Sequence, residues 1–105
     1  MSTNWFYPDA PNSQSDIRFD IRFIEAREHL ELAARYEKFR SFKAAVLEYK
    51  RARELIKHVP DIRGYRKTVL DIQEGLIWCH EKNGDLDAVA FESSILSAFR
   101  KRHRI

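Results

Sequence analysis

Apolar residues recur at three- and four-residue steps from Phe23 to the end of the chain, the spacing that places side chains on one face of a helix. Turn-forming residues interrupt this pattern at residues 39–41, 60–64 and 83–85. The pattern predicts four helices joined by short turns, so that each helix runs antiparallel to the next. The predicted fold class is therefore all-α.

Local signals mark where these helices begin and end. Ser41 is placed to cap the second helix, and Pro60 stops it. Asn83-Gly84 ends the third helix in the manner of a left-handed cap, and Asp85 is placed to cap the fourth. The turns are therefore expected to be short and well defined.

Each predicted helix has an apolar face that should be buried. The first helix has two such stripes, and one antiparallel neighbour can cover only one of them. They comprise Phe23, Ala26, Leu30, Ala33 and Ala34, and beside them Leu32, Tyr36 and Phe39. The third and fourth helices are predicted to bury Tyr65, Val69, Ile72, Leu76 and Cys79, and Ala88, Phe91, Ile95, Ala98 and Phe99.

The start of the chain has a different character. Residues 1–15 are rich in turn formers around the aromatic cluster Trp5-Phe6-Tyr7. Ile17–Phe23 alternates apolar and charged residues, so it is either a strand that pairs with another chain or the frayed start of the following helix. We expect residues 1–22 to be an irregular or extended segment and residues 23–105 to be the helical domain.

The first predicted hairpin has small and aromatic residues where close helix packing needs them, because alanine lets backbones approach and a ring fills the adjacent groove. These positions are Leu32-Ala33, Tyr36, Phe42, Ala45, Tyr49 and Ala52. The pattern resembles the signature of the tetratricopeptide repeat (TPR) family. Arg40 stands where the family has a turn glycine, and His29 where it has an early tryptophan.

The second hairpin matches this signature less well. With Gly84 as the turn glycine, Leu76 and Leu86 are in register. Positions where the family has small or aromatic residues hold Ile77, Val89, Ser93 and Leu96. The hairpins are offset by 44 residues, Arg40 to Gly84, against about 34 in the family. A generic four-helix bundle is the alternative architecture.

The TPR resemblance implies a scaffold that holds a peptide or a partner helix in a groove and performs no chemistry. One subclass of the family grips the C-terminal carboxylates of chaperones through lysine and asparagine one turn apart on its first helices. Residues 23–39 contain no such pair, and the corresponding face carries Arg27 and Glu31. Binding of chaperone tails is therefore disfavoured.

Composition places the chain among small soluble proteins. Its 105 residues are 44% hydrophobic and 33% charged, which suits one compact domain. The single cysteine, Cys79, excludes an intrachain disulfide and favours a reducing compartment. No stretch approaches the roughly 20 apolar residues of a membrane-spanning helix, and the first residues lack a signal-peptide pattern. We therefore expect a cytoplasmic or nuclear location without membrane contact.

The net charge of +3 is concentrated at the C-terminus, where Arg100, Lys101, Arg102 and Arg104 give the last six residues a charge of +4. These cations either complement the dipole of the last helix or contact a phosphate, a nucleic acid or an acidic partner. Further cations that would line the same end are Arg51, Arg53, Arg63, Arg66 and Lys67. RNA binding is therefore an alternative function.

Signals for catalysis are weak. Neighbouring histidines are at least 22 residues apart, so no two share a helix face as a metal pair does. The sequence also lacks His-Glu-x-x-His, Gly-x-Ser-x-Gly and a glycine-rich phosphate loop. We expect no enzymatic activity, no metal and no cofactor.

The predicted partner surface combines the aromatic cluster, the alternating segment and the groove side of the first hairpin. Its residues are Trp5, Phe6, Tyr7, Ile17, Phe19, Ile21, Phe23, Arg27 and Tyr36. We expect a small helical subunit or adaptor that binds another protein chain in a multi-subunit complex, or a second copy of itself. The alternative is an RNA-binding accessory subunit that uses the basic C-terminal end.

Overall fold

The computed structural model describes the backbone of residues 11–105 and the side chains of residues 19–105. It contains four helices: α1 (Pro11–Lys38), α2 (Phe42–Ile56), α3 (Tyr65–Asn83) and α4 (Leu86–His103). Residues 11–105 contain no strand. The predicted all-α fold of four helices is therefore confirmed.

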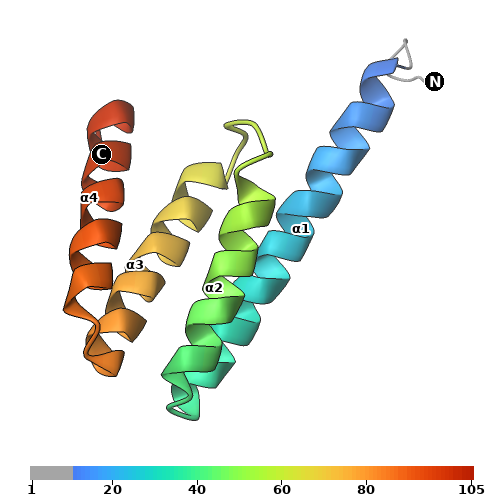
Figure 1. Ribbon diagram of the computed structural model, residues 1–105. Helices are drawn as coiled ribbons and strands as arrows, with labels where there is room; N and C mark the ends of the chain where they lie inside the picture. The colour runs from blue at the N-terminus through green and yellow to red at the C-terminus, as the bar shows by residue number, and fades with distance from the viewer. Residues whose placement is uncertain (1–10) are drawn as a thin grey trace.

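The four helices lie in a row, each antiparallel to the next (Figure 1). α1 packs on α2, α2 on α3 and α3 on α4, and α1 also touches α3. Over the described part of the chain, α4 packs against neither α1 nor α2. The Cα radius of gyration is 16.2 Å, above the roughly 13 Å expected for a compact domain of this length. The helices thus form an open row and not a closed bundle around one shared core.

α1 begins at Pro11, well before the predicted start at Phe23. The prediction of an irregular or extended segment over residues 1–22 is therefore wrong for residues 11–22. The alternating pattern of Ile17–Phe23 could form a strand only with a partner that satisfies its backbone groups, whereas a helix satisfies them within the segment. Proline is compatible with the first helical position, because the first N–H groups of a helix have no intrahelical acceptor.

The predicted turn chemistry is largely present. The Asp85 carboxylate accepts a hydrogen bond from the Ala88 backbone N–H at 3.1 Å, which caps α4. Gly84 ends α3 in the left-handed region with φ of 73°. Ser41 holds the N-cap position of α2, but its side chain makes no capping hydrogen bond. Before it, Arg40 adopts φ of 59°, a conformation that glycine adopts more readily.

Small residues fill the crossing of α1 and α2. Ala26, Ala33, Ala45 and Ala52 are completely buried, so the two backbones approach closely. The predicted inner face of α3 is confirmed, since its members are buried or packed against the core: Tyr65, Val69, Ile72, Leu76 and Cys79. The core therefore lies between α1, α2 and α3.

The buried face of α4 differs from the prediction. Phe99 is buried, but Phe91 is 61% exposed and Ile95 is 37% exposed. Ala98 is also exposed, and Ala88 is only half-buried. The prediction that Phe91, Ile95 and Ala98 are buried is therefore wrong.

A buried carboxylate explains the rotation of α4. The Glu92 side chain accepts hydrogen bonds from Arg53 of α2 at 2.6 Å and from Gln73 of α3 at 2.8 Å. Successive helical residues point about 100° apart. Turning Glu92 toward α2 and α3 therefore leaves the adjacent Phe91 facing solvent, whereas Ile95, three residues later, stays at the edge of the buried face and is only partly exposed.

Candidate functional site

The N-terminal part of α1 projects beyond α2 and carries exposed apolar side chains (Figure 1). Ile21 is 50% exposed and Ile24 is 56% exposed. Phe19 is half-buried. Two predicted partner residues, Phe19 and Ile21, lie in the N-terminal half of α1, as does Ile24, which the sequence pattern had not singled out. Its only signal was its i, i+3 spacing from Ile21.

Three other predicted partner residues tie α1 to the rest of the domain. Phe23 packs over the linker, where a Cβ at Gly64 would lie 3.3 Å from the Cζ atom of Phe23. Arg27 donates a hydrogen bond from Nη1 to Oγ1 of Thr68 in α3 at 3.0 Å. Tyr36 packs against the buried core. These side chains have structural contacts that the sequence did not reveal.

The remaining predicted partner positions lie outside the described residues or side chains. Trp5, Phe6 and Tyr7 precede the described chain, and the side chain of Ile17 is not among those described. Their assignment to a partner surface stays a prediction.

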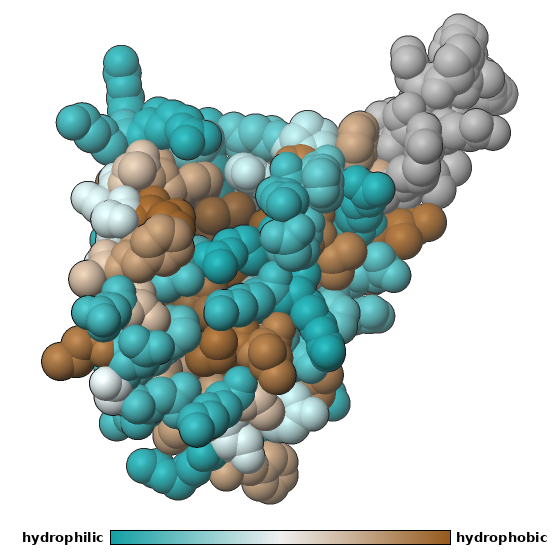
Figure 2. Space-filling view, viewed as in Figure 1, coloured by the Kyte–Doolittle hydropathy of each residue, from teal (hydrophilic) through white to brown (hydrophobic). Residues whose placement is uncertain are grey.

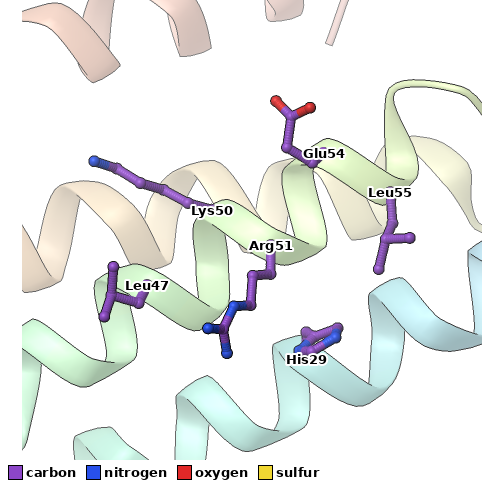
Figure 3. Close-up of a pocket in the computed structure, with 6 residues that line it drawn as sticks. All are labelled: His29, Leu47, Lys50, Arg51, Glu54 and Leu55. Carbon is purple, nitrogen blue, oxygen red and sulfur yellow. The ribbon is translucent and has the colours of Figure 1, made fainter.

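A wide, shallow depression of about 410 Å³ lies on the outer side of α1 and α2. Figure 3 shows His29 of α1 facing α2, which supplies the other lining residues. Those residues are Leu47, Lys50, Arg51, Glu54 and Leu55. Leu47 is 58% exposed. The depression is mainly apolar with cations at its rim, which suits contact with another chain more than chemistry on a small molecule.

A buried carboxylate, Glu48, supports this depression from below. Its Oε1 lies 2.7 Å from Nδ1 of His29, and its Oε2 accepts a hydrogen bond from Arg51 at 2.8 Å. In the sequence Glu48 stands among lysines and arginines at helical steps, a pattern that is typical of a solvated charged face. It is instead buried, and it joins α1 to α2.

A second, smaller cavity of about 120 Å³ opens between α2, α3 and α4. It is lined mainly by apolar side chains: Ile56, Tyr65, Val69, Ile72, Ile95 and Phe99, with Arg53, Lys57 and Gln73. The Arg53–Glu92 ion pair crosses one side of it. The sequence pattern placed Ile95 in a buried stripe, so this cavity was not predicted.

The start of α3 and the end of α4 lie on the same side of the domain (Figure 1). Cations gather there. The rings of Tyr65 and Phe99 hold these two helix ends together, with centroids 6.4 Å apart. Three cations here pair with acids: Arg66 with Asp61, Lys67 with Asp71 and Arg100 with Glu74. Among the side chains of residues 19–105, Lys101, Arg102 and Arg104 form no ion pair. This end of the domain therefore keeps a positive surface.

Comparison of the chain with protein-family models, with curated proteins and with solved structures finds no match.

The described residues contain no cluster of three histidine, cysteine, aspartate or glutamate side chains arranged to ligate a metal ion. No helix within residues 11–105 combines the length and the apolar character that crossing a membrane requires.

The thiol of Cys79 belongs to a buried hydrogen-bonded group. Glu37 accepts hydrogen bonds from the Tyr49 hydroxyl and from the Cys79 thiol, whose Sγ lies 3.6 Å away. Burial, helped by the charge of Glu37 and by this hydrogen bond, raises the pKa of Cys79 to about 12. Burial, the hydrogen bond to Glu37 and the charge of Glu37 likewise raise the pKa of Tyr49. Neither group is a reactive nucleophile at neutral pH, since the thiol reacts as thiolate.

These raised pKa values predict a loss of stability in alkali. Above pH 9, where an unperturbed thiol ionises, the unfolded chain loses the Cys79 proton, whereas the folded protein keeps it up to about pH 12. Tyr49 acts in the same direction at higher pH. The free energy of unfolding should therefore fall between pH 9 and 12, because the folded state binds more protons there. Urea unfolding at pH 8, 9 and 10 measures this, and Cys79→Ala should weaken the decline. An equal decline in that variant would contradict the role of Cys79.

Proposed function

We propose that this protein is a non-enzymatic protein–protein interaction module, a small TPR-like helical subunit or adaptor of a larger complex. The observation that carries this proposal is the exposed apolar surface on the projecting part of α1. Ile21 and Ile24 lie at i, i+3 and share one face of α1. The half-buried Phe19 lies on the opposite side of the helix, about 200° from Ile21. Single exposed apolar residues are ordinary, but neighbouring ones on a helix that extends beyond its partner form the kind of patch that interaction sites use.

The open row of helices supports the same proposal. Stacked helical hairpins contact only their neighbours, so the helix at each end of the row keeps an uncovered face. The TPR-like residues of the first hairpin, such as Ala45, Tyr49 and Ala52, are buried in the α1–α2 contact as a hairpin scaffold requires. Figure 2 shows apolar patches between charged side chains on one face of the molecule, which is typical of surfaces that meet other chains.

Replacing Ile21 with glutamate tests this proposal. We expect Ile21→Glu to weaken binding of the partner that co-purifies with the full chain at least tenfold, about 1.4 kcal/mol, because the carboxylate would lose its hydration in the interface. The four-helix fold should survive, since Ile21 is 50% exposed. Affinity purification with quantitative mass spectrometry measures the loss, and circular dichroism checks the fold.

Leu86→Glu is the control, because Leu86 is also an exposed apolar residue, 73% exposed, but lies at the start of α4. It should leave this binding unchanged. Deleting residues 100–105 should also have a smaller effect than Ile21→Glu. If that deletion abolishes binding and Ile21→Glu does not, the proposed surface on α1 is wrong.

RNA binding is the second candidate function, and the positive end of the row favours it. Lys101, Arg102 and Arg104 have no acidic partner among residues 19–105, so their charges are available to phosphates. An affinity for RNA that falls steeply as salt rises, and that deletion of residues 100–105 abolishes, would support this alternative.

A further inference from the structure

The cavity between α2, α3 and α4 lies in the space that α2 and α4 leave between them over α3, which is called the groove below. α2 and α4 both pack on α3, but in the described residues they do not pack on each other. The floor between them is formed by three side chains of α3: Tyr65, Val69 and Ile72. The Arg53–Glu92 ion pair bridges α2 and α4 across the groove at one point.

The α4 wall of this groove is apolar. Phe91, Ile95 and Phe99 are spaced by four residues, so they form one stripe along the helix. Phe99 and Ile95 line the cavity. Phe91 continues the stripe beyond it and is 61% exposed. Arg102, three residues after Phe99, lies near the end of the same stripe.

The α2 wall is basic. Lys50, Arg53 and Lys57 are spaced by three and four residues, so they form one stripe on α2. Arg53 and Lys57 line the cavity itself. Lys57 pairs with Glu54, but both side chains are more than half exposed, and such a pair is worth little. Lys50 lies at the outer edge of this stripe, where it also lines the depression on the outer side of α1 and α2, and it forms no ion pair with the side chains described from residue 19 onward.

The buried carboxylate beside this groove already has hydrogen-bond partners within the domain. Glu92 is buried, and Arg53 and Gln73 hold its carboxylate. The cavity lining contains no carboxylate. Glu54 is exposed between Lys50 and Lys57 and pairs with Lys57. The α2 wall therefore keeps an excess of cations, since Lys50, Arg53 and Lys57 stand against Glu54 and Glu92. An occupant with an apolar stripe and acidic residues beside that stripe complements both walls.

We propose that the groove between α2 and α4 binds an amphipathic helix of a partner protein, with its apolar stripe against Phe91 and Ile95 and its acidic flank against Lys50 and Lys57. The proposal rests on the proposed interaction function and names the partner's chemistry. The cavity of about 120 Å³ takes one large anchoring side chain, whereas small-molecule sites occupy roughly 300–1,000 Å³. Helices that dock in grooves use such anchors at three- and four-residue spacing.

Two synthetic peptide probes test this proposal with the full chain. Both have about five helical turns and leucines at i, i+4 and i+7, and their flanks carry either glutamates or lysines. We expect the acidic peptide to bind at least ten times more tightly than the basic one in fluorescence anisotropy, with an affinity that falls as salt rises. Equal affinity for the two peptides would overturn the proposal.

Three variants locate the binding. Phe91→Ser/Ile95→Ser should lower the affinity for the acidic peptide at least tenfold. Leu47→Ser should leave this affinity unchanged, because Leu47 is about as exposed as Phe91 but lies on the outer side of α2. Lys50→Glu/Lys57→Glu changes two exposed side chains, so the fold should be kept, and it should reverse the preference toward the basic peptide. A preference that stays acidic in this variant would overturn the proposal even if the Phe91/Ile95 variant failed to fold.

Two further measurements separate the remaining outcomes. Sedimentation of the wild-type chain shows whether it dimerises, and a dimer that Phe91→Ser/Ile95→Ser dissociates would make a second copy the occupant and overturn the proposal. Ile21→Glu should leave binding of the acidic peptide unchanged, because α1 does not pack against α4. If Ile21→Glu abolishes partner binding and the wild-type chain does not bind the acidic peptide, the groove is not a binding site. The proposed interaction function would still stand in that case.

Discussion

Gly75→Ala should lower the free energy of unfolding by about 2 kcal/mol, although alanine is the better helix former by about 1 kcal/mol. Gly75 lies in α3 directly against Tyr49 of α2, where a Cβ would come 2.6 Å from the tyrosine hydroxyl oxygen. Tyr49 cannot move aside at low cost, because its ring is buried and its hydroxyl donates a hydrogen bond to Glu37. The overlap therefore outweighs the gain in helix propensity.

Thermal and urea unfolding measure this effect, and a loss of 2 kcal/mol corresponds to a melting temperature lower by about 8–16 °C. Gly84→Ala is the comparison, because nothing lies within 4 Å of its Cβ position and only its φ of 73° opposes alanine. It should cost about 1 kcal/mol. In a Tyr49→Leu background the Gly75→Ala cost should largely disappear. A stabilised Gly75→Ala protein would show that the α2–α3 contact is looser than described.

Arg53→Met should also be strongly destabilising, by about 2–3 kcal/mol. The Glu92 side chain is only 4% exposed, so removal of Arg53 leaves a buried carboxylate with Gln73 as its remaining side-chain donor. The 31% exposure of the Arg53 side chain lets some water replace it, which places the expected cost below that of a fully buried pair. Urea unfolding measures the loss.

The double variant Arg53→Met/Glu92→Met should be more stable than Arg53→Met alone, because it removes the uncompensated charge. Gln73 would keep its hydrogen bond to the backbone carbonyl of residue 92, at 3.1 Å. Arg66→Met breaks the exposed pair with Asp61 and should cost less than about 0.5 kcal/mol. If Arg53→Met costs no more than this control, the ion pair does not hold α4 in place.

The candidate surfaces show which exposed apolar residues a local sequence pattern can predict. Ile21 was assigned to a partner surface from its alternating segment, and it is indeed 50% exposed in the structure. Phe23 and Tyr36 were assigned with it, but the linker and the core occupy them. The sequence pattern marks these residues alike as surplus apolar positions, and only the packing of the linker and of α3 distinguishes them. The groove wall of Phe91 and Ile95 was missed for the same reason.

The amino-acid sequence by itself determined the three turns, the caps at Gly84 and Asp85, the buried face of α3 and most of the buried face of α1. These features depend on residues within one or two helical turns of each other, so hydrophobic spacing and turn chemistry specify them. Ala34 and Phe39, which were predicted on the buried stripes of the first helix, are exposed. The tertiary structure alone decided the rotation of α4 and the burial of Glu92. Its partner Arg53 lies 39 positions earlier in the chain. A hydropathy pattern counts each of these charges as solvent-seeking, but once the fold brings them together, their mutual attraction offsets the cost of burying them.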